Sequence, residues 1–242
     1  MFSVILRKEI TSFFTGLSGY LITVVFLLST SLMLWVIPGQ YNILDSGYSN
    51  LNSLFEISQW LFIFLCPALT MKTIADEKQN GTWELLATKP IGIFQIVFGK
   101  FLASWILVII TLIPTIIFLI TVYYIAEPVG NVDLAAFWGS FIGLIFGASV
   151  FVSIGVFSSS LSKNQMGAFV VGVAITFMMY YGFDMLAMLF ESGRTISFIE
   201  NIGIHAHYKS ISRGVIDSRD IAYFIIVNIV FLYLTKKKLK IR

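Results

Sequence analysis

Six long apolar stretches decide what this chain can fold into. They occupy residues 17–36, 57–74, 96–124, 137–157, 166–190 and 221–235. A helix needs about 20 apolar residues to cross the hydrocarbon core of a bilayer. Lipid offers no hydrogen bonds, so a spanning segment must satisfy its own backbone groups, and an apolar run of this length does so as a helix. The sequence predicts an all-α integral membrane protein with six transmembrane helices.

The composition agrees with this prediction. Hydrophobic residues make up 57% of the 242 residues and charged residues 12%, against about 25% charged in an ordinary soluble domain. Six spans leave no room for a further soluble domain of about 100 residues. The chain is therefore expected to carry no nucleotide-hydrolysing domain of its own. Cys66 lies in an apolar run and is expected to be a small core side chain.

Residues 1–16 predict an amphipathic helix ahead of the first span. Apolar side chains recur at helical spacing, and Arg7 and Lys8 lie among the polar residues of the other face. Such a helix is expected in the headgroup plane, with Gly16 and Gly19 allowing a bend into the membrane. The alternative is that the segment is only the polar start of the first span.

The distribution of Lys and Arg predicts the orientation, because these residues favour the cytoplasmic side. If the amino terminus is inside, twelve of the sixteen lie on inner segments: Arg7, Lys8, Lys72, Lys78, Lys89, Lys100, Lys163, Lys236, Lys237, Lys238, Lys240 and Arg242. Residues 38–56 and 125–136 contain none, and the other four lie in residues 191–220. Both termini are therefore expected in the cytoplasm, and residues 191–220 are expected to form an outer loop with short helices.

Small and polar residues within the spans suggest packing and pathway positions. Gly139, Gly143 and Gly147 recur every four residues and form a helix-packing face, against either the same chain or another subunit. Pro114 is expected to kink the long third span. Asp184 lies near the outer end of the fifth span, where an ionisable group marks either a transport pathway or the headgroup level.

The inner segment 76–90 predicts a short cytoplasmic helix. Gly81 can take the left-handed conformation that ends a helix, and Thr82 can cap a new one. Glu84 falls in the first turn and Lys89 in the last, before Pro90. The resulting helix has about seven residues and is about 10 Å long, too short to span a bilayer.

This short helix would present Trp83, Leu85 and Leu86 beside the acidic Asp76 and Glu77. An aromatic and apolar surface of this kind suits docking into a groove of another protein. A solvated connector is the plainer alternative.

The same segment resembles the permeases of ABC-2 type transporters. The resemblance rests on Asp76-Glu77, Gly81-Thr82-Trp83-Glu84-Leu85-Leu86, Lys89-Pro90 and Gly99-Lys100. Residues 159–165 and 207–224 are similar to the branch that contains gliding-motility and copper-site-maturation permeases. The likeness extends over nearly the whole chain and is greatest to the gliding-motility permeases of bacteria.

This resemblance implies a single ABC-2 transmembrane domain over residues 1–242, with the fold of a type V ABC exporter. Residues 76–90 would form the coupling helix that docks on a cytoplasmic ATPase dimer. The docking residues would be Asp76, Glu77, Gly81, Thr82, Trp83, Glu84, Leu85 and Leu86. The chain has no G-x-x-x-x-G-K-[ST] run, so ATP and Mg²⁺ are expected in the ATPase and no cofactor in this chain.

The resemblance further implies a bacterial inner-membrane protein that works with a second permease copy or an auxiliary membrane subunit with a periplasmic part. Membrane lipids are the other expected partners, and no nucleic acid is expected. Another ABC-2 system (copper-site maturation, lipid or polysaccharide export) and a membrane scaffold of a surface machine are the alternatives. An enzyme is not expected, because the spans carry neither a Gly-x-Ser-x-Gly motif with a partner histidine nor two aspartates. No metal site is expected from His205 and His207.

Overall fold

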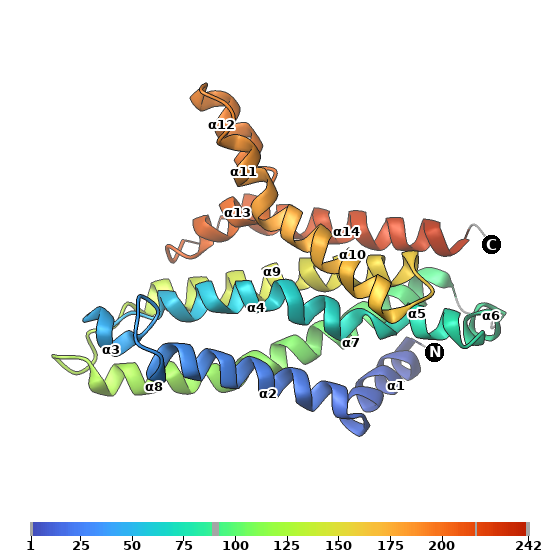
Figure 1. Ribbon diagram of the computed structural model, residues 1–242, viewed down its shortest axis with the longest axis horizontal. Coiled ribbons are helices and arrows are strands. Elements are labelled where there is room, and N and C mark those ends of the chain that lie inside the picture. Colours follow the sequence, from blue (N-terminus) through green and yellow to red (C-terminus); the bar gives the residue numbers. More distant parts are fainter. Residues whose placement is uncertain (1, 89–91, 216, 241–242) are drawn as a thin grey trace.

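The computed structural model describes residues 2–88, 92–215 and 217–240, and the described residues contain helices and no strand. Six helical stretches are long and apolar enough to cross a membrane, as the sequence predicts (Figure 1). They are Gly19–Val36, Asn52–Gln79, Ile93–Ile125, Leu134–Leu161, Gln165–Ala187 and Ser218–Lys240. The prediction of an all-α membrane protein with six transmembrane helices is confirmed.

Several of these stretches consist of more than one element. The first contains α2 (Leu17–Ser31) and a π-helical turn, and the second contains α4 (Asn52–Thr70) and α5 (Lys72–Gln79). The third contains α7 (Ile93–Leu112) and α8 (Ile116–Ile125), separated by a 3₁₀ turn that includes Pro114. The remaining ones are α9 (Leu134–Leu161), then α10 (Gln165–Phe177) with α11 (Phe183–Ala187), and α14 (Ser218–Lys240). Pro114, where the sequence predicts a kink, lies in this 3₁₀ turn.

Helix α9 is the centre of the bundle. It packs against α4, α7, α10, α13 and α14. Within its apolar stretch of 18 residues, 78% is buried inside the protein. Helix α2 lies at the periphery, because only 22% of the apolar stretch Gly19–Val36 is buried. The apolar surface left exposed on the peripheral helices is suited to contact with lipid.

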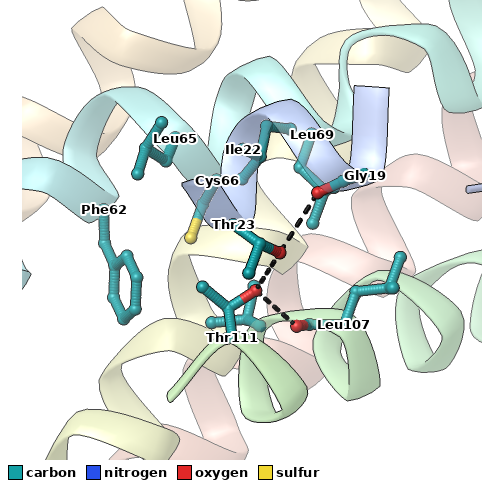
Figure 2. A pocket seen from close by; sticks show the side chains of 10 residues that line it. Gly19, Ile22, Thr23, Phe62, Leu65, Cys66, Leu69, Leu107 and Thr111 are labelled. Atoms are coloured by element: carbon teal, nitrogen blue, oxygen red, sulfur yellow. Dashed lines mark hydrogen bonds between the residues drawn. The ribbon is translucent and has the colours of Figure 1, made fainter. Parts of the chain in front are cut away.

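A narrow crevice separates α2 from α4 and α7 (Figure 2). The hydroxyl groups of Thr23 and Thr111 are 3.0 Å apart across it, and Cys66 lines it as a fully buried core side chain. Its volume of about 10 Å³ is about the least that can hold a single water molecule. The crevice is therefore part of the packed core and offers no room for cargo.

Helix α1 (Phe2–Thr15) lies against α7 at the end of the bundle that also carries α6 (Thr82–Ala87) (Figure 1). Its apolar residues Ile5 and Phe13 are buried. A Cβ atom at Gly99 of α7 would lie 3.1 Å from the Ile5 side chain. Part of the face that the sequence assigns to lipid thus packs on protein, while Val4 and Phe14 stay exposed.

The opposite, far end of the bundle carries α3 (Ile43–Ser46), and two further short helices follow α11: α12 (Gly193–Glu200) and α13 (Ile204–Ile211) (Figure 1). Helix α13 packs on α9 and α14, whereas α12 extends away from the bundle with α11 and has no buried residue. The segment 191–220 therefore contains short helices, with different surroundings.

The first two glycines of the α9 stripe pack within the chain, against α13 and the turn that follows it. A Cβ atom at Gly139 would lie 2.6 Å from the carbonyl oxygen of Ile211, and one at Gly143 would lie 3.3 Å from the Tyr208 ring. At Gly147 such an atom would meet nothing within 4 Å. Close approach thus requires glycine at Gly139, and the third position of the stripe is spacious.

This difference predicts opposite effects of two identical substitutions on stability. Gly139→Ala should lower the free energy of unfolding by about 1–3 kcal/mol, because the new methyl group collides with backbone. Gly147→Ala should leave it unchanged or raise it, because alanine favours the helix. Thermal unfolding of the purified protein in detergent measures both, and equal effects would contradict this packing.

Candidate functional site

A sharp elbow between α5 and α6 forms the segment where the sequence predicts docking. Gly81 has a φ of +70° and occupies the N-cap position of α6. Thr82 is the first helical residue, and its hydroxyl donates to the carbonyl oxygen of Glu77 at 3.3 Å. The expectation that Thr82 caps the helix is therefore wrong, because the left-handed glycine brings its hydroxyl back onto α5.

Helix α6 has six residues and carries Glu84 in its first turn, as expected. Lys89 and Pro90, which the sequence places at its end, lie outside the described residues. Glu84 and Leu85 are exposed, the latter at 68%, whereas Leu86 is half-buried. Trp83 packs against the apolar core, so it anchors α6 to the bundle besides offering surface.

Helix α5 is fastened to α9 by a serine. The Ser159 hydroxyl accepts hydrogen bonds from the backbone N–H groups of Ile74 and Ala75, both at 3.0 Å, and donates to the Met71 carbonyl oxygen at 2.9 Å. Donors in the first turn of a helix have no partner within the helix. Ser159 supplies that partner from another span, so a side chain of α9 holds the backbone of α5.

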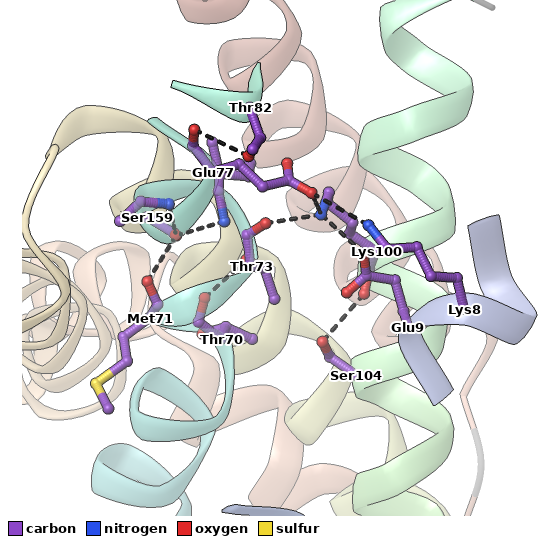
Figure 3. Close-up of polar contacts among 12 residues, drawn as sticks. Lys8, Glu9, Thr70, Met71, Thr73, Glu77, Thr82, Lys100, Ser104 and Ser159 are labelled. Carbon is purple, nitrogen blue, oxygen red and sulfur yellow. Dashed lines mark hydrogen bonds and ion pairs between the residues drawn. The ribbon is translucent and has the colours of Figure 1, made fainter. Parts of the chain in front are cut away.

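The acidic pair at the end of α5 splits between two neighbours. Asp76 accepts a hydrogen bond from the Gln165 side chain of α10 at 2.8 Å. Glu77 turns to the other side, toward Lys100 of α7 (Figure 3). The two residues that the sequence groups as one acidic docking surface therefore brace the elbow from opposite sides.

Lys100 is the centre of a buried ionic cluster (Figure 3). Its ammonium group lies 2.9 Å from Glu9 Oε1, 2.8 Å from Glu77 Oε1 and 2.7 Å from the Thr73 carbonyl oxygen. A lysine has three N–H donors, so all of them are used. Lys100 is 1% exposed, and a charge buried to this degree is tolerated only when it is paired and hydrogen-bonded.

The cluster joins three helices at one atom. Glu9 lies on α1, Glu77 on α5 and Lys100 on α7. Lys8 adds a weaker contact at the exposed edge, with its ammonium group 3.8 Å from Glu77 Oε1. A groove of about 240 Å³ runs from Lys8 and Glu77 to Leu85 of α6. The amphipathic helix, the elbow and the third span are therefore mechanically connected.

This cluster was not predicted from the sequence. Lys100 contributed there only to the charge distribution and to the family resemblance, because nothing local pairs it with a glutamate 91 positions earlier. The available signal was a lysine inside an apolar helix, which needs a buried counter-charge.

The remaining sequence candidates pair with one another near the far end. The Asp184 carboxylate lies 2.5 Å from Nδ1 of His205, and Asp220 lies 2.7 Å from Nδ1 of His207. The Nε2 group of His207 donates to the Asn201 carbonyl oxygen at 2.9 Å. These contacts hold α13 to α11 and α14. In the described part of the chain no three His, Cys, Asp or Glu side chains gather as a metal site.

We expect the protein to lose stability when the buried cation is removed, and to regain it when the carboxylates around the cation are neutralised as well. Lys100→Met should lower the free energy of unfolding by about 3 kcal/mol, because it leaves the partly buried carboxylates of Glu9 and Glu77 without their main counter-charge. Adding Glu9→Gln and Glu77→Gln to the same protein should restore most of the loss. Lys163→Met, at an exposed lysine, is the control and should change stability by less than about 0.5 kcal/mol. A loss that the two neutral partners do not relieve would contradict the ionic account.

A known protein family matches nearly all of the helices described above. The family described as ABC-2 family transporter protein matches residues 3–234, from α1 into α14. A search of curated proteins gives no match. With six membrane-spanning helices and a family match across almost its full length, the chain is a multi-pass membrane protein that belongs to the ABC-2 transporter family.

Proposed function

We propose that this chain is the membrane half of an ABC exporter and that its α5–α6 elbow docks on a separate cytoplasmic ATPase. The exposed Glu84 and Leu85 beside the groove supply the docking surface. The observation that carries the proposal is the Lys100 cluster, because it ties the elbow to α1 and α7. A docking element without such ties would move without moving the spans.

The proposed mechanism follows these contacts. ATP binding by two ATPase subunits displaces α6, and the displacement passes to α1 and α7 through Lys100. It passes to α9 through Ser159 and to α10 through the Asp76–Gln165 hydrogen bond. Packed helices move as rigid elements, so a small shift at α6 becomes a tilt of several spans. ATP and Mg²⁺ are held by the ATPase.

The proposed setting is the bacterial inner membrane, with both termini in the cytoplasm. Six spans form one half of a transporter, so the partner is a second copy or an auxiliary membrane subunit with a periplasmic part. Gliding motility is the proposed process, and its output is either export or force transmission to that partner. The spans carry no row of charges, which favours an amphipathic or lipid-like cargo over a hydrated ion.

Reversing the charge on α6 tests the docking surface. Glu84→Lys should reduce ATPase co-purification with the tagged chain about tenfold, because like charges across an interface are unfavourable. Glu191→Lys, at an exposed glutamate outside the elbow, should leave co-purification unchanged. A Leu85→Cys variant should cross-link to the ATPase through the introduced thiol.

Unchanged co-purification of Glu84→Lys, together with no cross-link from position 85, would refute docking at α6. ATP-dependent cargo movement in reconstituted vesicles then separates an exporter from a scaffold, since a scaffold binds the ATPase without transport.

A further inference from the structure

A pocket of about 350 Å³ opens at the far end of the bundle, between the π-helical turn after α2, the α3 region, and the end of α8 with the turn that follows it. Its apolar part includes Trp35, Ile43 and Val122, and its polar part includes Tyr48, Ser49 and Glu127. Pockets that bind small molecules have this size and this mixture of apolar walls and few polar groups. Nothing in the coupling mechanism uses it.

Hydrogen bonds fix the walls of this pocket. The Ser49 hydroxyl donates to the Asn131 carbonyl oxygen at 2.5 Å and so ties the loop after α3 to the turn after α8. Asn42 is 5% exposed and accepts from the backbone N–H of Leu44 at the start of α3. The Asn42 amide also donates to the Ile37 carbonyl oxygen at 3.2 Å. The pocket is therefore built into the fold.

The charged residues of the two chain segments that form the pocket are all acidic. Residues 38–56 and 125–136 contain Asp45, Glu56, Glu127 and Asp133 but no Lys or Arg. Asp45 accepts from the Gly39 N–H, and Asp133 caps α9. Glu127 lines the pocket and makes no hydrogen bond or ion pair with any residue that the structure describes. Its carboxylate is exposed at the pocket and gives the pocket a negative charge that suits a positively charged ligand.

We propose that this pocket binds an ammonium group attached to a short hydrocarbon segment. Glu127 neutralises the cation, and the aromatic rings of Trp35 and Tyr48 add the attraction of their faces for a positive charge. Ile43 and Val122 provide apolar surface for the adjoining hydrocarbon.

Two kinds of ligand carry such an ammonium group, one in the membrane and one in solution. Tyr123 and Tyr124, at the end of α8, are exposed, and exposed tyrosines at the end of a span are typical of the headgroup level. A phospholipid with an ammonium headgroup is one source, and a soluble alkylammonium compound is the other.

A thiol-protection experiment tests the proposal. Leu44→Cys places a thiol in the pocket lining, and Cys66→Ala removes the native thiol. The full chain is held in nanodiscs of phosphatidylglycerol, and maleimide labelling is followed with choline or with 3,3-dimethylbutan-1-ol, its neutral isostere. Choline should protect the thiol at about tenfold lower concentration than the isostere, because the charge and the aromatic faces favour the cation.

Two variants control the experiment. Glu127→Gln should abolish the preference for choline over the isostere. Leu134→Cys places a thiol at an exposed residue at the start of α9 that does not line the pocket, and choline should not protect it. Equal protection by choline and the isostere, or a preference that survives in Glu127→Gln, would overturn the proposal.

Replacing phosphatidylglycerol by phosphatidylcholine or phosphatidylethanolamine identifies the source. Protection without added choline in these nanodiscs assigns the site to a lipid headgroup, and protection by added choline alone assigns it to a soluble ligand. No protection in either arm refutes the site. Helix α3, which lines the pocket, and α6 lie at opposite ends of the bundle (Figure 1), so this outcome would leave the coupling proposal untouched.

Discussion

The buried ammonium group of Lys100 is the constraint on which the end of the bundle that carries α6 depends. An isolated charge in an apolar environment is strongly unfavourable, so Lys100 can remain on the inner side of α7 only while Glu9 and Glu77 surround it. Those two carboxylates come from α1 and α5. A single electrostatic requirement therefore fixes the position of the amphipathic helix and of the elbow relative to the third span.

Helix α9 provides the complementary constraint. Ser159 near one end binds the first backbone donors of α5, and Gly139 near the other end admits the backbone of the α13 segment. The central helix thus holds the elbow through the Ser159 hydroxyl and meets the α13 segment through a close backbone approach at Gly139. Contacts made directly to backbone atoms leave little freedom for adjustment, which agrees with the proposed transmission of displacement through α9.

The parts of the fold that were predictable from the sequence are those set by local signals. The six spans follow from the length of apolar runs, and the elbow follows from Gly81. The cap was assigned to Thr82 because hydroxyl residues favour that position, but its hydroxyl instead donates to the carbonyl of Glu77. Local preference could not anticipate a partner supplied by the turn itself.

The parts of the site that were not predictable depend on residues distant in sequence. Glu9, Glu77 and Lys100 were each visible, yet their pairing requires the packing of α1 on α7. The glycine stripe was recognised from its spacing, but spacing does not say that α13 covers it. Spacing identifies a packing face, and only tertiary structure identifies the partner of that face.

The central claim is that α1 and α6 move as one body through Lys100. Spin labels at Ser12 of α1 and at Thr88, the C-cap residue of α6, both exposed, allow the distance between these helices to be measured by electron spin resonance in the ATPase complex. A second pair, at Thr88 and at Leu44 of α3, reports movement of the elbow relative to the far end. The account predicts that ATP changes the second distance and leaves the first unchanged, and that Lys100→Met makes the first distance vary. A first distance that changes with ATP in the unaltered cluster would contradict it.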